Sequence, residues 1–429
     1  MSTGTVPSRA LVTSMCLLFG VSFFNYMDRY MLSVLLPAIK TDLVLSDFQL
    51  GIISGFAFTL FYATLGVPIA RLADKHSRRR IVSAALAVWS LMTAACGLAQ
   101  SFIQLTIARV LVGVGEAGAT PPSHSLISDY YAAGKRTLGM SIYSLGAPVG
   151  ILVGFIVGSW LAENYSWRHA LIAVGVPGIL LSGLVLTFLH EPPRGGAAAG
   201  PADDDAPSLR QVAARLLKSR AFVMFAVGTG LYTVVWLGVI GWLPSYFTRS
   251  FDMSLSQAGF WLALVLGFSQ IIGMLLSGFV TDSLVGRDTR WYALVPTIAV
   301  GVATPLFLLV FFTSSAWVGF ALLFPAFMIS VMQGPATFSA IQGLVPPRMR
   351  AMASAVLLLV TNLIGGGLGT TLVGLFSDLL TPRFGDEALR FSLLGVAVGF
   401  SVLATLSYFV ASMTIRQELA AQNATAASP

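Results

Sequence analysis

The sequence predicts an all-α membrane protein with twelve transmembrane helices in two pseudo-symmetric bundles of six. Three observations predict this fold: low charge content, twelve apolar segments long enough to cross a bilayer, and a polar linker with a repeated motif on either side. Of the 429 residues 56% are apolar and only 10% are charged, whereas soluble domains carry roughly 25% charged residues. A helical crossing uses about 20 mostly apolar residues, so the apolar content suits about twelve crossings.

Charge breaks and proline or glycine positions divide the chain into twelve apolar segments. A backbone that crosses lipid must satisfy its own hydrogen bonds, so each segment is expected to be a helix and not a barrel strand. The expected spans are 11–38, 48–71, 80–101, 103–129, 138–161, 169–190, 220–247, 257–281, 291–313, 316–344, 351–378 and 389–414.

Basic residues set the expected orientation. Eighteen lie in loops on the side of the N-terminus, and the five on the opposite side are Lys40, Arg168, Arg249, Arg383 and Arg390. Because cytoplasmic loops carry the excess of basic residues, we expect a multi-pass protein of the cell (inner) membrane with both termini in the cytoplasm. The net charge of +7 then faces anionic lipid, and no nucleic-acid partner is expected.

A polar low-complexity segment divides the chain. The expected regions are a first six-helix bundle over 1–190, a cytoplasmic linker over 191–219, a second six-helix bundle over 220–415 and a cytoplasmic tail over 416–429. Within the linker, Leu209, Val212, Leu216 and Leu217 fall near helical spacing. This spacing predicts either a short amphipathic helix on the membrane surface or the frayed start of the seventh helix.

An internal repeat supports the two halves. Asp74 follows the second helix among basic residues, and Asp282 follows the eighth helix, 208 residues later. Repeated halves with a substrate site near the membrane midplane are typical of secondary transporters. The segment 70–80, ARLADKHSRRR, resembles the loop signature of the major facilitator superfamily, with Ala70 and Ser77 in place of its two glycines.

This resemblance implies a cytoplasmic latch between the halves. In that family the aspartate meets the N-terminus of a helix in the opposite half, where unpaired N–H groups attract a carboxylate. Asp74 would meet the eleventh helix and Asp282 the fifth, while Asp129 would pair with Arg71 or Arg78. The residues of the expected latch are Arg71, Asp74, Arg78, Asp129, Arg136 and Asp282.

The fifth helix carries a glycine at every fourth position: Gly146, Gly150, Gly154 and Gly158. Small residues at this spacing are first of all a packing seam that lets two helices approach closely. With Pro148 they also resemble the signature of superfamily antiporters, so both interpretations stay open.

Four ionisable residues lie deep inside apolar spans: Asp28 and Arg29 on the first helix, and Arg109 and Glu116 on the fourth. A charge at the bilayer centre costs about 2.5–3.5 kcal/mol on insertion scales, so such residues usually face a cavity and find partners. Their depths interleave at about 1.5 Å per residue, and Asn25 lies one turn before the first pair. Two acids and two arginines form a neutral set, the cheapest buried arrangement.

We therefore expect proton coupling at Asp28 or Glu116. Protonating one acid would release an arginine, which is then available to an anionic headgroup. The alternative is a permanent ion-pair network that only orients the first and fourth helices. Since no nucleotide site is visible, the expected energy source is a proton gradient without any cofactor or metal.

The second half differs, because the middles of its seventh and tenth helices carry aromatic and amide side chains and no charge. A cavity charged on one wall and apolar on the other suits an amphiphile, whereas a sugar would need more hydrogen-bonding partners. His124 is either a proton relay or a cavity-lining residue. The candidates for substrate contact or switching are Asn25, Tyr26, Arg29, Arg109, His124, Tyr232, Trp236, Gln333 and Phe338.

The run Phe24–Tyr30, FNYMDRY, together with Gly113–Ala117, GVGEA, resembles the spinster branch of the major facilitator superfamily. The resemblance implies transport of lysophospholipids or sphingosine phosphates, with Asp28 and Glu116 as protonation sites and Arg29 as a switch or substrate contact. A proton-coupled amphiphile transporter, monomeric in the bilayer, is the leading hypothesis.

Two other functions remain as alternatives. A carrier of small organic anions or drugs is the runner-up, because arginines bind carboxylates as well as phosphates. A lipid-flipping or lipid-modifying enzyme is disfavoured, because the sequence offers no nucleophile with a base or metal set.

Overall fold

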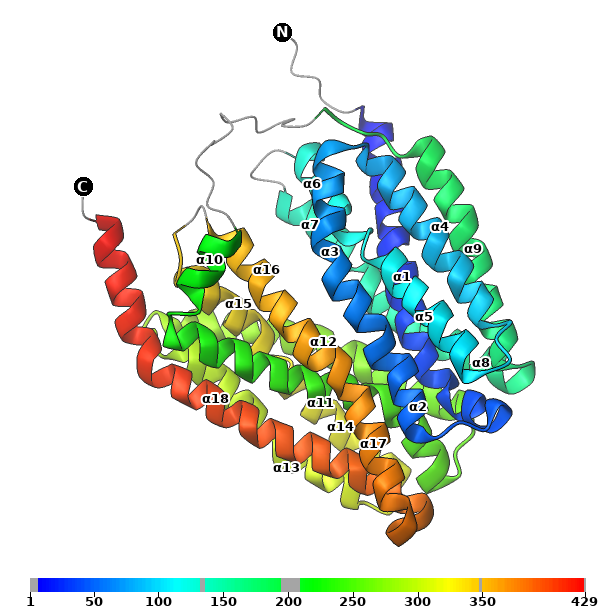
Figure 1. Ribbon diagram of the computed structural model, residues 1–429. Helices are drawn as coiled ribbons and strands as arrows, with labels where there is room; N and C mark the ends of the chain where they lie inside the picture. Colours follow the sequence, from blue (N-terminus) through cyan, green and yellow to red (C-terminus); the bar gives the residue numbers. More distant parts are fainter. Residues whose placement is uncertain (1–6, 132–135, 194–208, 347–348, 428–429) are drawn as a thin grey trace. The chain divides into compact units, whose positions relative to one another are not determined.

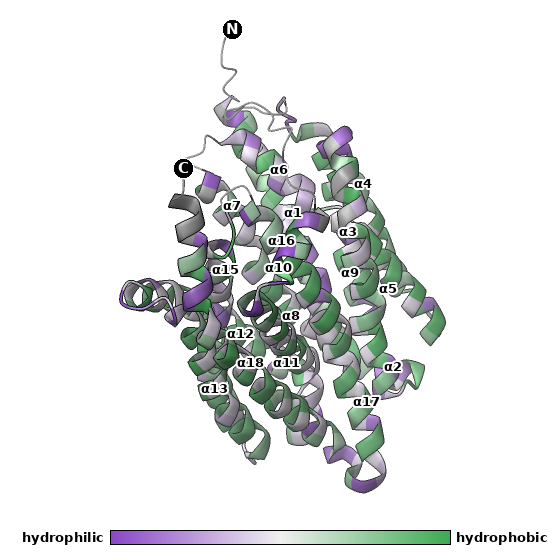
Figure 2. Ribbon diagram, turned by 60° about the vertical axis from the view of Figure 1, so that its left-hand side comes forward, coloured by the Kyte–Doolittle hydropathy of each residue, from purple (hydrophilic) through white to green (hydrophobic). Residues whose placement is uncertain are grey.

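The computed structural model describes residues 7–131, 136–193, 209–346 and 349–427. All regular elements in these ranges are helices (Figure 1), and apolar residues dominate their middles (Figure 2). Within the described residues, eleven stretches are long and apolar enough to cross a membrane. The last, Met352–Gln422, has 71 residues, far more than the roughly 20 of one crossing, and the turn Gly385–Glu387 divides it in two. The predicted fold of twelve transmembrane helices is therefore confirmed.

The chain forms two compact units. The first comprises Met1–Asp203 and Met253–Ala263, and the second comprises Asp204–Asp252 and Leu264–Pro429. The helices of the first unit are α1 (Ser8–Leu43), α2 (Asp47–Gly51), α3 (Ala57–Lys75), α4 (Arg78–Cys96), α5 (Phe102–Glu116), α6 (Thr120–Tyr130), α7 (Arg136–Ser144), α8 (Gly146–Asn164) and α9 (Trp167–Phe188).

The second unit begins with a short helix and ends with a long one. Its helices are α10 (Leu209–Leu216), α11 (Arg220–Phe251), α12 (Leu255–Val285), α13 (Trp291–Phe312), α14 (Ala316–Ser330), α15 (Gln333–Gly343), α16 (Arg350–Thr361), α17 (Gly367–Phe384) and α18 (Ala388–Ala427). The start of α12 groups with the first unit, where a Cβ at Gly259 would lie 2.4 Å from Ser159 Oγ of α8.

Several crossings are interrupted near their middles. The fourth is broken between α5 and α6, where Pro121 and Pro122 open the new helix, because proline lacks the N–H that a continuing helix would need. The tenth is broken between Ser330 and Gln333. A π-helical turn over Ile52–Phe56 joins α2 to α3.

The glycines of the fifth crossing form a seam between α8 and α1. A Cβ at Gly150 would lie 2.4 Å from the carbonyl oxygen of Phe23, and one at Gly154 would lie 2.9 Å from that of Met27. Both distances are shorter than real Cβ contacts, so only glycine allows this approach. The seam places α8 directly against the part of α1 that carries the buried charges.

Two expected features near the unit ends differ in the structure. The amphipathic segment of the linker is a helix of its own, α10, but Val212 and Leu216 are buried in the core of the second unit and do not face lipid. The expected tail over 416–429 is a helical continuation of α18 as far as Ala427. It continues because Ile415 and Leu419 belong to the same buried core.

Candidate functional site

Two ion pairs join α1 to α5 inside the first unit. Arg29 Nη2 lies 2.6 Å from Glu116 Oε2, and Arg109 Nη1 lies 3.5 Å from Asp28 Oδ1. The four residues that the sequence singles out as costly are thus brought together in pairs across the two helices. Adjacent residues of α1 serve different partners, because successive side chains on a helix point in different directions.

The two pairs differ in their access to solvent. Asp28, Arg109 and Glu116 are at most 2% exposed, whereas the Arg29 side chain is 23% exposed. Asn25 Nδ2 donates to Glu116 Oε2 at 2.9 Å, and Thr93 of α4 donates its hydroxyl to Asp28 Oδ2. The Arg29–Glu116 pair is therefore the one whose cation reaches the surface.

Arg109 has few polar contacts for a buried guanidinium. Among the described residues, none of its three side-chain nitrogens has a hydrogen-bond partner, and Asp28 Oδ1 and Glu116 Oε1 also have none. A buried charge without full hydrogen bonding is costly. The site consequently holds polar groups that are only partly satisfied by the first unit itself.

Aromatic rings of α3 and α1 surround Arg29. Its Cζ lies 4.7 Å from the ring centres of Phe58 and Tyr62 and 5.7 Å from that of Tyr26. Cations are attracted to the electron-rich faces of such rings. Tyr26 is among the contact residues predicted from the sequence, whereas Phe58 and Tyr62 are not. The spacing of four between Phe58 and Tyr62 places both rings on one helix face. That signal is weak, because aromatic pairs at this spacing also occur in ordinary helix packing.

Gly113 explains why α3 comes so close to the ion pairs. A Cβ there would lie 2.5 Å from the carbonyl oxygen of Phe58. The glycine between Arg109 and Glu116 thus allows the α3 backbone to press against α5, and it sets the position of the Phe58 ring.

The other predicted contact residues have contacts of their own. His124 is exposed and packs edge-on against Tyr143, with ring centres 5.2 Å apart. In the second unit Tyr232 donates to Ser330 Oγ at 2.7 Å. The Trp236 ring lies 5.3 Å from that of Phe327.

Gln333 and Phe338 both lie on α15 of the second unit. Gln333 Oε1 accepts from the Tyr408 hydroxyl at 2.6 Å. Phe338 is half-buried and packs against the hydrophobic core of that unit. These contacts are polar or aromatic, and none of them involves a charged side chain.

Arg78 is the first residue of α4, directly after the loop that follows the second crossing. It is 1% exposed, forms an ion pair with Asp129, and donates to Ser125 Oγ at 3.0 Å and to the Pro192 carbonyl at 2.8 Å. Its backbone N–H donates to Glu191 Oε1 at 2.7 Å. Glu191, which the sequence assigns to the linker, thus belongs structurally to the first unit.

The latch between the halves stays a prediction. The side chains of Arg71 and Asp74 lie outside the described residues. Asp282 is exposed near the end of α12, and Arg136 donates its Nε to the Tyr131 carbonyl at 3.3 Å.

The hydrogen bonds that Glu191 accepts should make the stability of the first unit depend on pH. Burial opposes ionisation of Glu191, but hydrogen bonds from Ser77 and the Arg78 N–H, with the Arg78 charge, lower its pKa. A lowered folded-state pKa contributes stability above the unfolded value of about 4.3, and this stability is lost as pH falls through the folded-state value. We expect Glu191→Gln to melt at a lower temperature than the unchanged protein in detergent at pH 7, and the difference to shrink as the pH falls below about 4 and through the lowered folded-state value. A difference that is equal at both pH values would contradict this assignment, and Asp386→Asn, at an exposed position of the turn Gly385–Glu387, provides the control.

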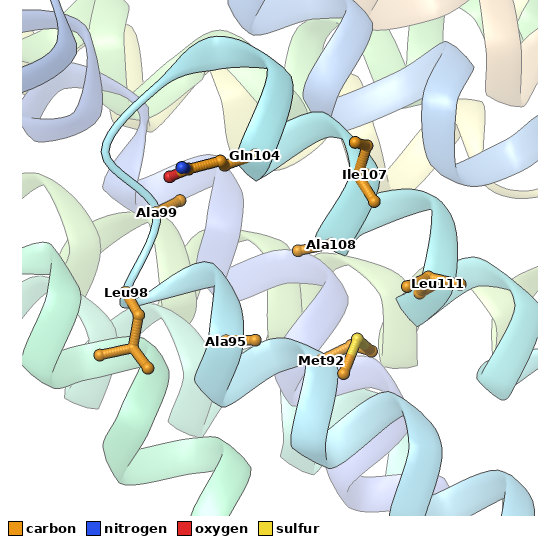
Figure 3. Close-up of a pocket in the computed structure, with 8 residues that line it drawn as sticks. All are labelled: Met92, Ala95, Leu98, Ala99, Gln104, Ile107, Ala108 and Leu111. Carbon is orange, nitrogen blue, oxygen red and sulfur yellow. The ribbon is translucent and has the colours of Figure 1, made fainter.

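A shallow apolar groove of about 320 Å³ lies along α4, α5 and the loop that joins them (Figure 3). Leu98 and Ile107 on its edge are more than half exposed. The lining residues are Met92, Ala95, Leu98, Ala99, Gln104, Ile107, Ala108 and Leu111. The lining contains no charged side chain, so the groove is distinct from the ion-pair site.

Residues 18–370 match the family model of the Major Facilitator Superfamily. The chain belongs to the major facilitator superfamily. As predicted, it is a membrane transporter and not an enzyme. The match extends into both units and includes Asp28, Arg29, Arg109 and Glu116.

The similarity to spinster proteins extends over nearly the whole chain. The crystal structure of a bacterial homolog of the human lysosomal transporter Spinster, in an inward-facing and unoccupied conformation, superposes with a TM-score of 0.88 at 28% identity, over 96% of this chain and 99% of that one. Protein spinster homolog 3 of Danio rerio is 25% identical over 97% of this chain and 88% of its own length. An MFS-type efflux pump of Mycolicibacterium smegmatis is 31% identical over 93% and 92%. The predicted resemblance to the spinster branch is confirmed.

Proposed function

We propose that the protein is a proton-coupled secondary transporter of an amphiphilic, anionic, lipid-like substrate of the lysophospholipid or sphingoid phosphate class. The pairing of buried Glu116 with partly exposed Arg29 carries this proposal. A proton on Glu116 neutralises the partner of Arg29, and the freed guanidinium can then bind a phosphate or carboxylate. The substrate and the proton are thereby linked through one arginine.

Of the two acids, Glu116 is the one that we expect to carry the coupled proton. Its partner Arg29 does not become a fully buried unpaired charge when it leaves Glu116, because its side chain is partly exposed and lies beside three aromatic rings. Asp28 is bound to the fully buried Arg109 and to Thr93. Protonating Asp28 would leave Arg109 as an uncompensated buried charge, which is strongly unfavourable.

The surroundings of Arg29 support an amphiphile as substrate. A guanidinium recognises an anionic headgroup, while the rings of Tyr26, Phe58 and Tyr62 offer apolar surface to its chain. In the second unit, the seventh crossing carries the uncharged aromatic residues Tyr232 and Trp236 near its middle. The resemblance to spinster proteins implies the same substrate class.

A second candidate function is export or import of small organic anions or drugs. The relative from Mycolicibacterium smegmatis is named an efflux pump, and a 26% identical relative from Bacillus subtilis is named a hexuronate transporter. Hexuronates carry a carboxylate, which Arg29 would bind as readily as a phosphate. We favour the lipid-like substrate because of the aromatic rings that surround this arginine.

The two-unit architecture supports alternating access as the transport mechanism. We place the protein in the cell (inner) membrane with both termini in the cytoplasm, as the distribution of basic residues favours, and we expect it to act as a monomer. The proton biases the equilibrium between outward-open and inward-open states only if the two states bind it with different affinity. No cofactor besides the proton gradient is needed for this cycle.

Uptake into liposomes tests the proposal. Purified protein in vesicles with an imposed pH gradient is expected to accelerate movement of a fluorescent lysophospholipid by at least about tenfold over protein-free vesicles. Hexuronate and other small carboxylates, tested in the same vesicles, should move at the protein-free rate. Gradient-driven movement of the carboxylates alone would instead establish the second candidate function.

A further inference from the structure

A single aromatic ring contacts the cations of both ion pairs. The Phe58 ring centre lies 4.7 Å from Arg29 Cζ and 5.2 Å from Arg109 Cζ. Phe58 comes from α3, a third helix that contributes no acid or base to the site. Its side chain is only 4% exposed, so the ring is enclosed where it meets the two guanidinium groups.

The position of this ring is held from three directions. Its backbone is pressed against Gly113 of α5. The π-helical turn that ends at Phe56 shifts the helical register just before the ring, and such turns are frequent at functional sites. The Tyr62 ring stacks on it with centres 5.6 Å apart and planes 17° apart. A ring held in this way can keep its contact with a guanidinium group while that group loses or gains a carboxylate partner.

We propose that Phe58 is a positioning residue that couples the two ion pairs, holding Arg29 when Glu116 takes a proton while keeping Arg109 beside Asp28. This role rests on the proposed proton coupling. A guanidinium that loses its carboxylate inside a protein needs another partner, and the face of a desolvated ring supplies one. Phe58 therefore makes protonation of Glu116 less costly than it would be against an aliphatic side chain.

The direction of the effect follows from this exchange of partners. Without the ring, Arg29 depends more on ionised Glu116, so a proton competes less well for that carboxylate. The midpoint of proton-dependent behaviour then moves to lower pH. The titratable groups that face the two ion pairs from the surrounding helices are Tyr26 of α1, Tyr62 of α3, Cys96 of α4 and Tyr143 of α7.

The test compares variants of Phe58 in two pH profiles. Phe58→Leu and Phe58→Met remove the ring and keep a similar apolar volume, whereas Phe58→Tyr keeps the ring. The first profile is uptake of the lysophospholipid as a function of external pH. The second is the midpoint of thermal unfolding in detergent against pH, which responds to carboxylate ionisation whether or not transport is proton-driven. Phe61→Leu, on the exposed side of the same helix, is the matched control.

We expect Phe58→Leu and Phe58→Met to lower the pH midpoint of both profiles by about 0.5 unit, a threefold loss of proton affinity. Phe58→Tyr and Phe61→Leu should keep the original midpoints. Unshifted midpoints in both ring-free variants, or an equal shift in Phe58→Tyr, would overturn the inference. If uptake by the unchanged protein is independent of pH, the proposed coupling fails, and the unfolding profile alone decides the role of Phe58.

Discussion

Replacing Glu116 with glutamine is expected to abolish the stimulation of uptake by a pH gradient, while exchange of substrate between the two sides continues. Glutamine cannot take up the proton, and a ligand that neither state binds cannot shift the equilibrium between them. Uptake by this variant should therefore be the same with and without the gradient. The measurement is lysophospholipid uptake in vesicles, with and without the gradient.

Asp28→Asn should act mainly on folding. The change leaves Arg109 buried without its anionic partner, and breaking a buried pair in this way costs about 3–5 kcal/mol. We therefore expect a lower yield of folded protein and a lower thermal midpoint in detergent, with the pH dependence of the remaining transport preserved. A well-folded Asp28→Asn protein that has lost the gradient effect would assign the coupled proton to Asp28 instead.

A double variant separates coupling from charge balance at Glu116. Arg29→Met combined with Glu116→Gln removes both members of the pair and keeps the site neutral. Its thermal midpoint should exceed that of Glu116→Gln alone, because no unpaired guanidinium remains. Uptake should be weak because the substrate-binding Arg29 is missing, and the uptake that remains should not depend on the gradient. Full gradient-driven uptake by either variant would show that Glu116 is not the coupling residue.

Gly150→Leu is expected to eliminate folded protein. A Cβ at this position would already lie 2.4 Å from the Phe23 carbonyl oxygen, and backbone of a neighbouring helix cannot move aside as a flexible side chain can. Overpacking costs typically 1–3 kcal/mol and more where nothing can relax. Separation of α1 from α8 would also displace Asp28 and Arg29. Size-exclusion chromatography in detergent should show aggregated protein.

Gly183→Leu is the matched control for this substitution. Gly183 lies on α9, and a Cβ there meets nothing within 4 Å. The same glycine-to-leucine change should therefore leave a monodisperse protein with a thermal midpoint within a few degrees of the original. Equal loss of folded protein in both variants would attribute the effect to a bulkier side chain at any helix position and not to the α1–α8 seam.

Much of the candidate site was predictable from residue type and depth. Charges inside apolar spans are costly wherever the helices pack, so Asp28, Arg29, Arg109 and Glu116 stood out without a structure. Their interleaved depths also followed from the rise per residue. The aromatic partners did not stand out, because Phe58 and Tyr62 are unremarkable in an apolar helix until a cation is placed beside them.

Contacts at the ends of the units were harder to predict. Glu191 follows an apolar span and precedes a polar segment, so the sequence assigns it to a linker. Glu191 accepts a hydrogen bond from the Arg78 N–H, 113 residues away along the chain. This bond requires the start of α4 to lie beside the end of α9. The burial of Val212 against the second unit likewise needs a neighbouring core that the local spacing cannot reveal.

The sequence alone determined that the chain crosses the membrane twelve times and that four charges must neutralise one another inside the first half. These are matters of composition and length, because the cost of placing a residue in hydrocarbon depends little on which helix lies beside it. Only the tertiary structure decided that Glu116 pairs with Arg29 and Asp28 with Arg109. Those pairings depend on the rotation of α1 and α5 about their axes and on the close approach of α3 at Gly113. Contacts between segments far apart in the sequence establish both.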